Sequence, residues 1–391
     1  MEANTAQAAA AQPCAGKVLH FRQSSQIWGP ERAILDLCRE LPKHGFPCEI
    51  AVLYRKPPAG RGEHPLLAAA RAQGIPAHQL DGHLHSLPSV VNWLCRKLRR
   101  ERFSILHTHE YKTDLLGVAA ATLMGAEGPA LVATVRHTEP SLQMRAFQGL
   151  DSLILGRFDG LTVSSEAALR RLGNRRKLLA RTRVIRNHGV GEWPSLDEES
   201  SSPAPPETSG GPVISIIGRL EAVKNHRLFL ESARRVLDHK RDARFWIVGE
   251  GELRPKLEAL ARRLELGPAV SFLGYRTDIG SVLKASEVLV ISSSYEAGPR
   301  VLCEGFSLAK PVVATAVGGI PELLRDGETG ILVPPNDPEA LAAAILRLLE
   351  DRGLSARMAA AGRRRLLAWR ENESPTAALA ELYREVMARR I

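Results

Sequence analysis

The segment Val288–Glu304 reads VLVISSSYEAGPRVLCE and contains the repeating unit that decides the fold. It begins with a continuous apolar run, which is typical of a strand covered on both faces, and a helical segment follows the polar loop. Similar apolar runs alternate with helix-period segments along the whole chain. Buried strands separated by helices indicate βαβ units, so we predict an α/β protein with parallel sheets.

The strand candidates form two groups. In the first half of the chain they are Lys17–Phe21, Cys48–Leu53, Ser104–Thr108, Ala130–Val135, Leu161–Ser165 and Arg183–Asn187. In the second half they are Val213–Ile217, Arg244–Val248, Ala269–Leu273, Val288–Ile291, Pro311–Thr315 and Gly330–Val333. We therefore expect two Rossmann-like, doubly wound parallel-sheet domains that face a central cleft, with ligands beyond the carboxyl ends of the strands.

Changes in composition predict the domain boundaries. Residues 194–212 are rich in proline, serine, glycine and acidic side chains, as in an exposed linker between domains 17–193 and 213–370. Residues 1–16 are expected to form a flexible tail, and 371–391 a C-terminal helix that could pack back on the first domain. No apolar run approaches the roughly 18 residues of a membrane span, and the start lacks the basic region of a signal peptide, so a cytoplasmic location is expected.

The positive charge of the chain is unevenly distributed. The net charge is +10, and residues 1–190 carry an excess of 26 basic over 15 acidic side chains, whereas the remainder is nearly neutral. Such a surface attracts nucleic acid, anionic lipid or phosphorylated substrates, and an ordinary solvated face explains it equally well. The segment Val90–Arg102 combines apolar side chains with five basic ones, which suits either a helix lying on anionic lipid or an amphipathic helix packed on the core.

The first chemical signal follows the strand Val213–Ile217. Gly218 allows a tight turn, and Arg219 and Lys224 place two cations near the start of the next helix. Arginine binds phosphate oxygens bidentately, lysine acts as a point charge, and a helix N-terminus favours anions. The turn is therefore a candidate diphosphate site, although this spacing alone favours a surface arginine and lysine on a helix cap.

The second signal is the pair Glu296 and Glu304. The first is expected in the loop after the strand and the second inside the following helix, so that both face the strand-end crevice. Backbone amides of the intervening residues at a helix N-terminus suit sugar hydroxyls or phosphate. A carboxylate that binds a ribose diol is familiar in this topology, and a capped helix with solvated carboxylates is the alternative.

At these residues the chain resembles the retaining glycosyltransferases of family four, the "group 1" type with the GT-B fold. The motifs occur in the family's order, and they are Gly218–Lys224, Gly249–Glu252, Phe272–Tyr275, Tyr295–Glu304, Lys310–Glu322 and Gly327–Pro334. In the first half, Gly29–Arg32 resembles the glycine loop near the donor phosphate and His107–His109 a segment of the acceptor domain. Ala297–Arg300 stands where the family usually has G-F-P-N, so different sugar contacts are expected there.

The resemblance implies transfer of a sugar from a nucleoside-diphosphate sugar to a lipid-linked or polysaccharide-precursor acceptor, with retention at the anomeric carbon. It implies that the N-terminal domain binds the acceptor and the C-terminal domain the nucleotide sugar. Arg219, Lys224 and Glu296 would form the catalytic set, and Glu304 would hold the ribose. Further substrate contacts are expected from Gly29, His137, Gly218, Gly249, Tyr275, Gly298, Pro299, Arg300 and Val301.

No metal or cofactor beyond the nucleotide sugar is expected. Asp-x-Asp and C-x-x-C are absent from the sequence, and two cations with a helix terminus would replace a metal at the diphosphate. His107 and His109 would share one face of a strand, as in a metal site, but no third ligand is expected nearby, which favours a structural or acceptor-lining role. The five tryptophans, Trp28 among them, are expected in core or interface packing.

Two other functions remain open. An epimerase that acts on the nucleotide sugar itself shares this two-domain architecture, although the Gly218–Lys224 motif and the spaced glutamates argue against it. A non-enzymatic protein that binds an anionic ligand or nucleic acid would explain the basic first half, but the sequence contains no zinc-finger, homeodomain or RNA-recognition signature. We therefore expect no nucleic-acid partner. The basic first domain would suit a peripheral position of the transferase at the inner face of a membrane.

Overall fold

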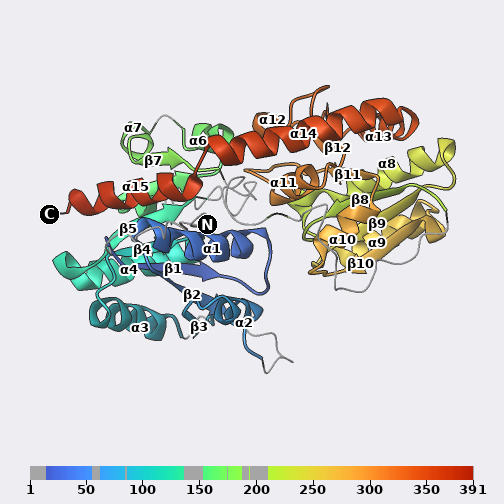
Figure 1. Cartoon of the computed structure of the whole chain (residues 1–391). Coiled ribbons are helices and arrows are strands. Elements are labelled where there is room, and N and C mark those ends of the chain that lie inside the picture. The colour runs from blue at the N-terminus through green and yellow to red at the C-terminus, as the bar shows by residue number, and fades with distance from the viewer. Residues whose placement is uncertain are drawn as a thin grey trace, which may run out of the picture.

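Two parallel sheets organise the part of the chain that the computed structural model describes, which is residues 15–54, 62–83, 86–135, 153–173, 175–186, 193 and 210–390. The first sheet has seven strands in the order β3-β2-β1-β4-β5-β6-β7, and the second has six in the order β10-β9-β8-β11-β12-β13. Figure 1 shows the two sheets as two lobes, the first blue to green and the second yellow to orange. The predicted GT-B-type α/β fold of two Rossmann-like domains is confirmed.

Most of the described elements of the first lobe alternate between strand and helix. They are β1 (Val18–Gln23), α1 (Gly29–Glu40), β2 (Cys48–Tyr54), α2 (Pro65–Ala72), β3 (Ala77–Asp81), α3 (Leu87–Arg100), β4 (Ile105–Thr108), α4 (Tyr111–Met124), β5 (Ala130–Thr134), β6 (Gly160–Val163), α6 (Glu166–Arg171), α7 (Arg176–Leu179) and β7 (Thr182–Val184).

The second lobe repeats this alternation and ends in three consecutive helices. Its elements are β8 (Val213–Ile217), α8 (His226–His239), β9 (Arg244–Val248), α9 (Arg254–Arg263), β10 (Val270–Gly274), α10 (Ile279–Ala285), β11 (Val288–Ile291), α11 (Arg300–Ser307), β12 (Val312–Thr315), α12 (Ile320–Leu323), β13 (Ile331–Val333), α13 (Pro338–Glu350), α14 (Arg352–Asn372) and α15 (Pro375–Ala388).

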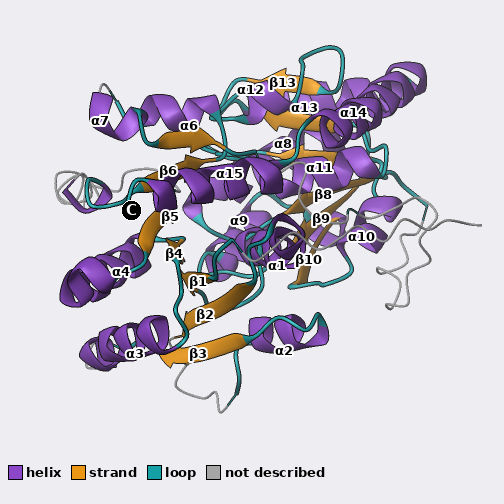
Figure 2. Ribbon diagram, turned by 60° about the vertical axis from the view of Figure 1, so that its left-hand side comes forward, coloured by secondary structure: helices purple, strands orange, loops and turns teal. Residues whose placement is uncertain are grey.

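The central strands are mostly apolar because helices cover both faces of each sheet, as Figure 2 shows, although β1 and β4 also carry the buried side chains of His20 and His107. Ile214 and Ile216 of β8 belong to one hydrophobic cluster of the second lobe, and Val213 belongs to the cluster on the opposite face. In both sheets the strand order reverses once, between β1 and β4 and between β8 and β11. Such switch points open a crevice at the carboxyl ends of the strands, where ligands of this fold class bind.

One strand was not expected from the sequence. β3 reads AHQLD, lies at the edge of the first sheet, and buries only Leu80. An edge strand needs little apolar content because one of its sides faces solvent. By contrast, the largely buried strands β8, β9 and β11 have the bounds expected from their apolar runs.

The C-terminal helix returns to the first lobe. Figure 1 shows α14 and α15 in red, with α14 along the second lobe and α15 over the first. Tyr383 of α15 is fully buried, and its hydroxyl lies 2.6 Å from Nδ1 of His107. In the second lobe, Gly362 of α14 lies directly against the ring of Phe306 in α11. The last two helices thus tie the lobes together. Most of the predicted tail (residues 1–16) and of the predicted linker (residues 194–212) lies outside the described residues.

The structure decides between the two interpretations of segment 90–102. Val90, Leu94 and Leu98 of α3 are buried in the core of the first lobe, so the apolar face of this helix packs on the protein and not on lipid. Its exposed side chains include the basic Arg96, Arg99 and Arg100. Of the helices that the structure describes, none combines the length and apolar composition needed to cross a membrane.

Candidate functional site

A cavity of about 250 Å³ lies between the two lobes, at the carboxyl ends of the central strands of the second sheet. The loop before α1 forms its opposite wall. The predicted site residues that line it are Gly29, Gly218, Arg219, Lys224, Gly249, Tyr275, Glu296, Gly298, Pro299, Arg300, Val301 and Glu304. Segments far apart in the sequence therefore meet at one cavity, whereas His137 lies outside the described residues.

Local hydrogen bonds fix the turn that carries the two cations. β8 ends at Ile217, and Lys224 closes a short 3-10 turn, Ala222–Lys224, just before α8. Asn225 adopts a left-handed backbone conformation (φ 49°) and caps α8 by accepting from the amide of Leu228. The hydroxyl of Ser292 donates to the carbonyls of both Lys224 and Asn225 at 3.0 Å. The cationic turn is thereby held against the end of β11.

The two cations differ in their partners. Nζ of Lys224 lies 2.5 Å from Oε1 of Glu296, which also accepts from the hydroxyl of Ser293 at 2.8 Å. Nη1 of Arg219 lies 2.8 Å from Oε1 of Glu221, and both of these side chains are more than a third exposed. The Arg219–Glu221 pair is therefore weak, because solvent screens it, and the guanidinium is free to turn onto an anion.

The Glu296 loop is shaped by a glycine pair. The amide of Gly319 donates to the carbonyl of Glu296 at 2.8 Å, and a Cβ added to Gly318 (φ 54°) would lie 1.9 Å from that carbonyl oxygen. This pair forms no nucleotide-binding motif in the sequence, but glycine is required here because two backbones approach closely. The contact positions the loop that ends in the N-terminus of α11.

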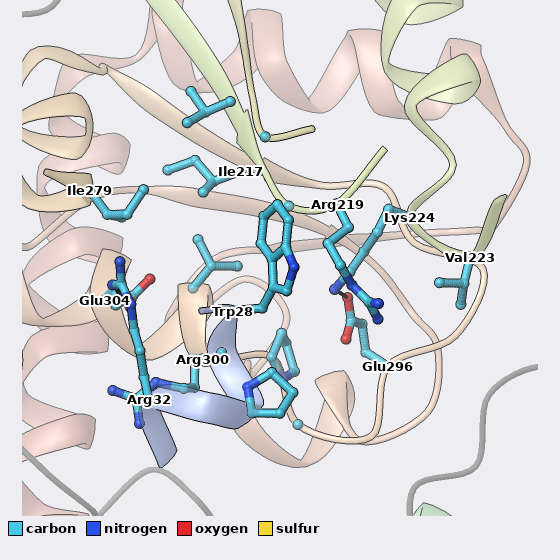
Figure 3. A pocket seen from close by; sticks show the side chains of 18 of the residues that line it. Trp28, Arg32, Ile217, Arg219, Val223, Lys224, Ile279, Glu296, Arg300 and Glu304 are labelled. Carbon is cyan, nitrogen blue, oxygen red and sulfur yellow. Dashed lines mark hydrogen bonds and ion pairs between the residues drawn. The ribbon is translucent and has the colours of Figure 1, made fainter. Parts of the chain in front are cut away.

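The other end of the cavity contains side chains that the sequence did not mark as site residues. Figure 3 shows Arg219, Lys224 and Glu296 together on one side of Trp28, and Arg32, Arg300 and Glu304 on the other. Nη1 of Arg32 lies 3.6 Å from Oε1 of Glu304. Trp28 was expected in core or interface packing; it does pack between the lobes, but it also lines the cavity.

Tyr275 connects the two walls of the cavity. Its ring packs edge-on against Trp28 with centroids 5.2 Å apart, and its hydroxyl donates to the carbonyl of Ile27 at 2.8 Å. Trp28 itself precedes the first residue of α1. An aromatic surface thus closes the cavity at the end of β10, where a flat ring such as a nucleotide base can stack.

Titratable groups beneath the cavity are kept uncharged by burial. Burial, with the nearby Lys224 charge, lowers the pKa of His226 to about 3. Burial raises the pKa of the Cys303 thiol to about 12, against the opposing effect of Arg300. The fixed charges that a ligand meets are therefore those of the arginines, lysine and glutamates of the lining.

The expectation that His107 and His109 lack a third potential ligand is wrong. His20 of β1 pairs with His107 across the sheet, and the three imidazoles offer nitrogens within 4.8 Å of one another. Nδ1 of His20 lies 2.9 Å from Nε2 of His109. Nε2 of His107 lies 2.8 Å from the hydroxyl of Thr134 and Nδ1 is paired with Tyr383, so both nitrogens of this ring are already occupied. The cluster is a buried hydrogen-bonded network between the first sheet and α15.

Two family models match the chain and together cover most of it. The model described as "Glycosyltransferase Family 4" matches residues 27–188, and "Glycosyl transferases group 1" matches residues 197–365. Each match falls on one of the two sheets, and the second includes every cavity-lining residue of the second lobe.

Individual relatives give a similar result. An α-D-kanosaminyltransferase of Streptomyces kanamyceticus is 36% identical over 38% of this chain and 39% of its own length. A UDP-Gal:α-D-GlcNAc-diphosphoundecaprenol α-1,3-galactosyltransferase of Escherichia coli is 27% identical over 70% of this chain and 73% of its own length. The chain spans 39% and 57% of the first two curated relatives that it matches.

The fold also matches solved structures along nearly the whole chain. Anabaena HepE, solved in complex with UDP and glucose, superposes with a TM-score of 0.78 at 20% sequence identity and covers 94% of this chain and 98% of its own. At this level of identity the likeness concerns the fold alone.

Proposed function

Since the chain belongs to the family 4 glycosyltransferases with the GT-B fold, we propose that it transfers a sugar from a nucleoside-diphosphate sugar to a lipid-linked or polysaccharide-precursor acceptor. The proposed reaction retains the configuration at the anomeric carbon. The observation that carries the proposal is the lobe-spanning cavity, in which Arg219 and Lys224 lie at the end of β8 opposite the Gly29 loop.

Each part of the cavity has a role in this reaction. Bond cleavage leaves negative charge on the departing diphosphate, and Arg219, Lys224 and the amide at the start of α1 stabilise that charge. Glu304 accepts hydrogen bonds from the ribose diol, and the Trp28–Tyr275 surface stacks on the base. Glu296, held by Lys224 and Ser293, orients the donor sugar.

The chemistry of the lining supports a mechanism without a metal ion. Divalent cations prefer several carboxylate oxygens, and the two glutamates that the described residues place in this cavity are each paired with a cation. Arg219 and Lys224 can neutralise the diphosphate directly. In the proposed mechanism, activity persists in the presence of EDTA.

The acceptor class is proposed from the relatives. The E. coli relative is named for transfer to a diphosphoundecaprenol-linked sugar, which is a lipid-linked acceptor. The first lobe, which faces the donor cavity, would bind such an acceptor, and its basic exterior would allow a peripheral position at an anionic membrane. Figure 2 shows α3 beside β3, the strand at one edge of the first sheet, and α6 near β6 toward the other edge. The exposed basic side chains of these helices are Arg96, Arg99 and Arg100 of α3, Arg170 and Arg171 of α6, and Arg176 and Lys177 of α7.

The decisive experiment measures donor binding and turnover with a panel of UDP-, GDP- and ADP-sugars. One class of donor is expected to raise the melting temperature. Lys224→Ala and Arg219→Ala are each expected to lower kcat by roughly 100-fold or more, because each removes positive charge from the leaving diphosphate. Lys256→Ala, which changes an exposed lysine of α9, is the matched control and should behave as wild type.

The possible outcomes separate the candidate functions. An α-configured product from an α-configured donor, observed by NMR, supports retention. Formation of an epimeric nucleotide sugar without acceptor would replace the transferase with an epimerase. If nucleic acid raised the melting temperature and none of the nucleotide sugars did, the chain would be a non-enzymatic binding protein. Full activity in both alanine variants would overturn the assignment of the diphosphate site.

A further inference from the structure

Two ion pairs cross the lobe interface between α1 and α11. Arg32 and Asp36 are four residues apart on α1, and Arg300 and Glu304 are four residues apart on α11, so each pair of side chains shares one helix face. Nη1 of Arg300 lies 3.0 Å from Oδ2 of Asp36, and Arg32 lies 3.6 Å from Glu304. The cation of each helix thus faces the anion of the other, and we call this set the interhelical brace.

The Asp36–Arg300 arm of the brace is well buried. The two side chains are 13% and 10% exposed, and the Arg300 guanidinium also lies over the ring of Trp193 at 4.3 Å. A guanidinium that is both stacked and ion-paired has little freedom to move. Removing one partner of a buried pair leaves the other charge uncompensated, so this arm favours the observed spacing of the lobes.

Arg300 also supports the glycine loop directly. A Cβ added to Gly29 would lie 3.6, 3.8 and 3.9 Å from the Cδ, Cβ and Cγ atoms of Arg300, so the glycine lies beside the arginine stem. Gly29 is the first residue of α1, and amides at that position have no partner within the helix. The position of Arg300 therefore sets where the start of α1 lies above the cavity.

The Arg32–Glu304 arm differs in length and exposure. Its distance is 3.6 Å, and the Arg32 side chain is 29% exposed, whereas Glu304 is nearly buried. In the proposed function Glu304 binds the ribose diol, which needs the same carboxylate oxygens that face Arg32. Ribose and Arg32 therefore compete for one carboxylate.

We propose that Asp36 and Arg300 are positioning residues that hold the Gly29 loop over the donor diphosphate, and that Arg32 occupies Glu304 until the donor ribose displaces it. The Asp36–Arg300 pair is then present with and without donor, whereas the Arg32–Glu304 pair is replaced by a contact between Glu304 and the donor ribose. This inference rests on the proposed function of the cavity. It assigns the interface a part in donor recognition that the Arg219–Lys224 turn does not supply.

The Asp36–Arg300 arm is tested by a double-mutant cycle. Asp36→Asn and Arg300→Gln are each expected to raise the KM for the donor and to lower kcat/KM by about 10-fold, with an unchanged KM for the acceptor. The double variant should be no worse than the more impaired single variant, because both changes remove one interaction. Asp238→Asn, which breaks the exposed Arg234–Asp238 pair of α8, is the control and should match wild type.

Each other result of the cycle counts against the positioning role. If kcat/KM fell by about 100-fold in the double variant, which is the product of the two single losses, the two residues would act separately. Wild-type kinetics in either single variant would mean that the loop keeps its position without the pair. Melting temperatures measured alongside identify a variant that fails to fold, and Arg300→Lys, which retains the charge but lacks the planar fork, should then show a partial loss of kcat/KM.

The Arg32–Glu304 arm predicts a change of the donor KM in the opposite direction. Arg32→Gln removes the competitor and is expected to lower the donor KM about three-fold with kcat unchanged. This decrease in the donor KM should disappear with a 2′-deoxyribose donor, because such a donor has one hydroxyl fewer to donate to Glu304. A raised donor KM in Arg32→Gln would show that Arg32 binds the donor itself and would overturn this arm. Absence of any transfer by wild type with the whole donor panel would instead refute the proposed function.

Discussion

Individual charges in the cavity are already partnered before a ligand arrives. Lys224 and Glu296 are 72 positions apart in the sequence, yet their charged atoms lie 2.5 Å apart. The residue types indicated phosphate and sugar chemistry, because cations near a helix N-terminus and a spaced glutamate pair suit those groups. The partners could not be inferred from the sequence, since they depend on how β8 and β11 are placed side by side.

His226 allows a residue-scale test of the environment beneath the cavity. The folded protein keeps this imidazole neutral, with a pKa of about 3 against an ordinary value of 6.5. The unfolded chain therefore binds an additional proton between these values, so the contribution of His226 destabilises the fold as the pH falls below 6.5. At pH 5 the cost is about 2 kcal/mol, from about 1.4 kcal/mol for each pH unit.

The expected result is a difference between two stability profiles. His226→Leu removes the titrating group, so its free energy of unfolding should fall about 2 kcal/mol less than that of wild type between pH 7.5 and pH 5. Denaturant titrations at the two pH values measure this difference. Parallel profiles for the two proteins would mean that the imidazole is accessible to protons in the folded state.

At the scale of elements, the glycine turn before α12 is expected to control the Glu296 loop. Gly318→Ala would place a methyl group 1.9 Å from the carbonyl oxygen of Glu296, so the loop must shift. Stability should fall by more than about 2 kcal/mol, and the donor KM should rise roughly 10-fold, because backbone atoms cannot move as easily as a side chain. Thermal unfolding and donor kinetics test both parts.

Gly74 provides the matched control for that substitution. It also has a positive φ (69°), but no described atom lies within 4 Å of an added Cβ. Gly74→Ala should therefore cost only the backbone strain of about 1 kcal/mol and leave kinetics unchanged. Equal losses in the two variants would show that strain, and not contact with the loop of Glu296, determines the effect.

The elements differ in how well the sequence predicts them. β11 and the start of α11 lie where Val288–Glu304 places them, because a strand buried on both faces is a continuous apolar run and Pro299 precedes the helix. β3 was missed because its edge position requires only Leu80 to be buried. Trp28 and Arg32 were not assigned to the site because they contact the second lobe, and a pattern within one lobe contains no information on that contact.

At the scale of the whole molecule, the lobes contact each other at several places besides the predicted linker. Glu322 of the second lobe accepts from the amides of Glu166 and Ala167 at 3.0 and 2.8 Å, at the start of α6. The guanidinium of Arg171 lies 3.8 Å above the ring of Tyr295. These contacts surround the cavity, so the separation of the lobes and the shape of the donor site are physically coupled.

The charge excess of the first lobe gives the last prediction, because the structure divides it between two edges of one sheet. Arg96, Arg99 and Arg100 are exposed on α3, and Leu123 is 72% exposed on the adjacent α4. A basic surface next to an exposed leucine favours anionic lipid, at about 1 kcal/mol for each arginine near the headgroups. We expect the protein to bind vesicles that contain phosphatidylglycerol, and binding to fall as salt is raised.

Replacing the three α3 arginines by glutamine should weaken vesicle binding by roughly 100-fold, from about 3 kcal/mol of lost attraction. Arg262→Gln/Arg263→Gln, which changes two exposed arginines of α9 in the second lobe, is the control and should bind as wild type. Sedimentation with vesicles at low and high salt measures the effect. Binding that is insensitive to salt, or equal losses in the two variants, would place the membrane contact away from α3, and no binding at all would remove the peripheral position from the proposed function.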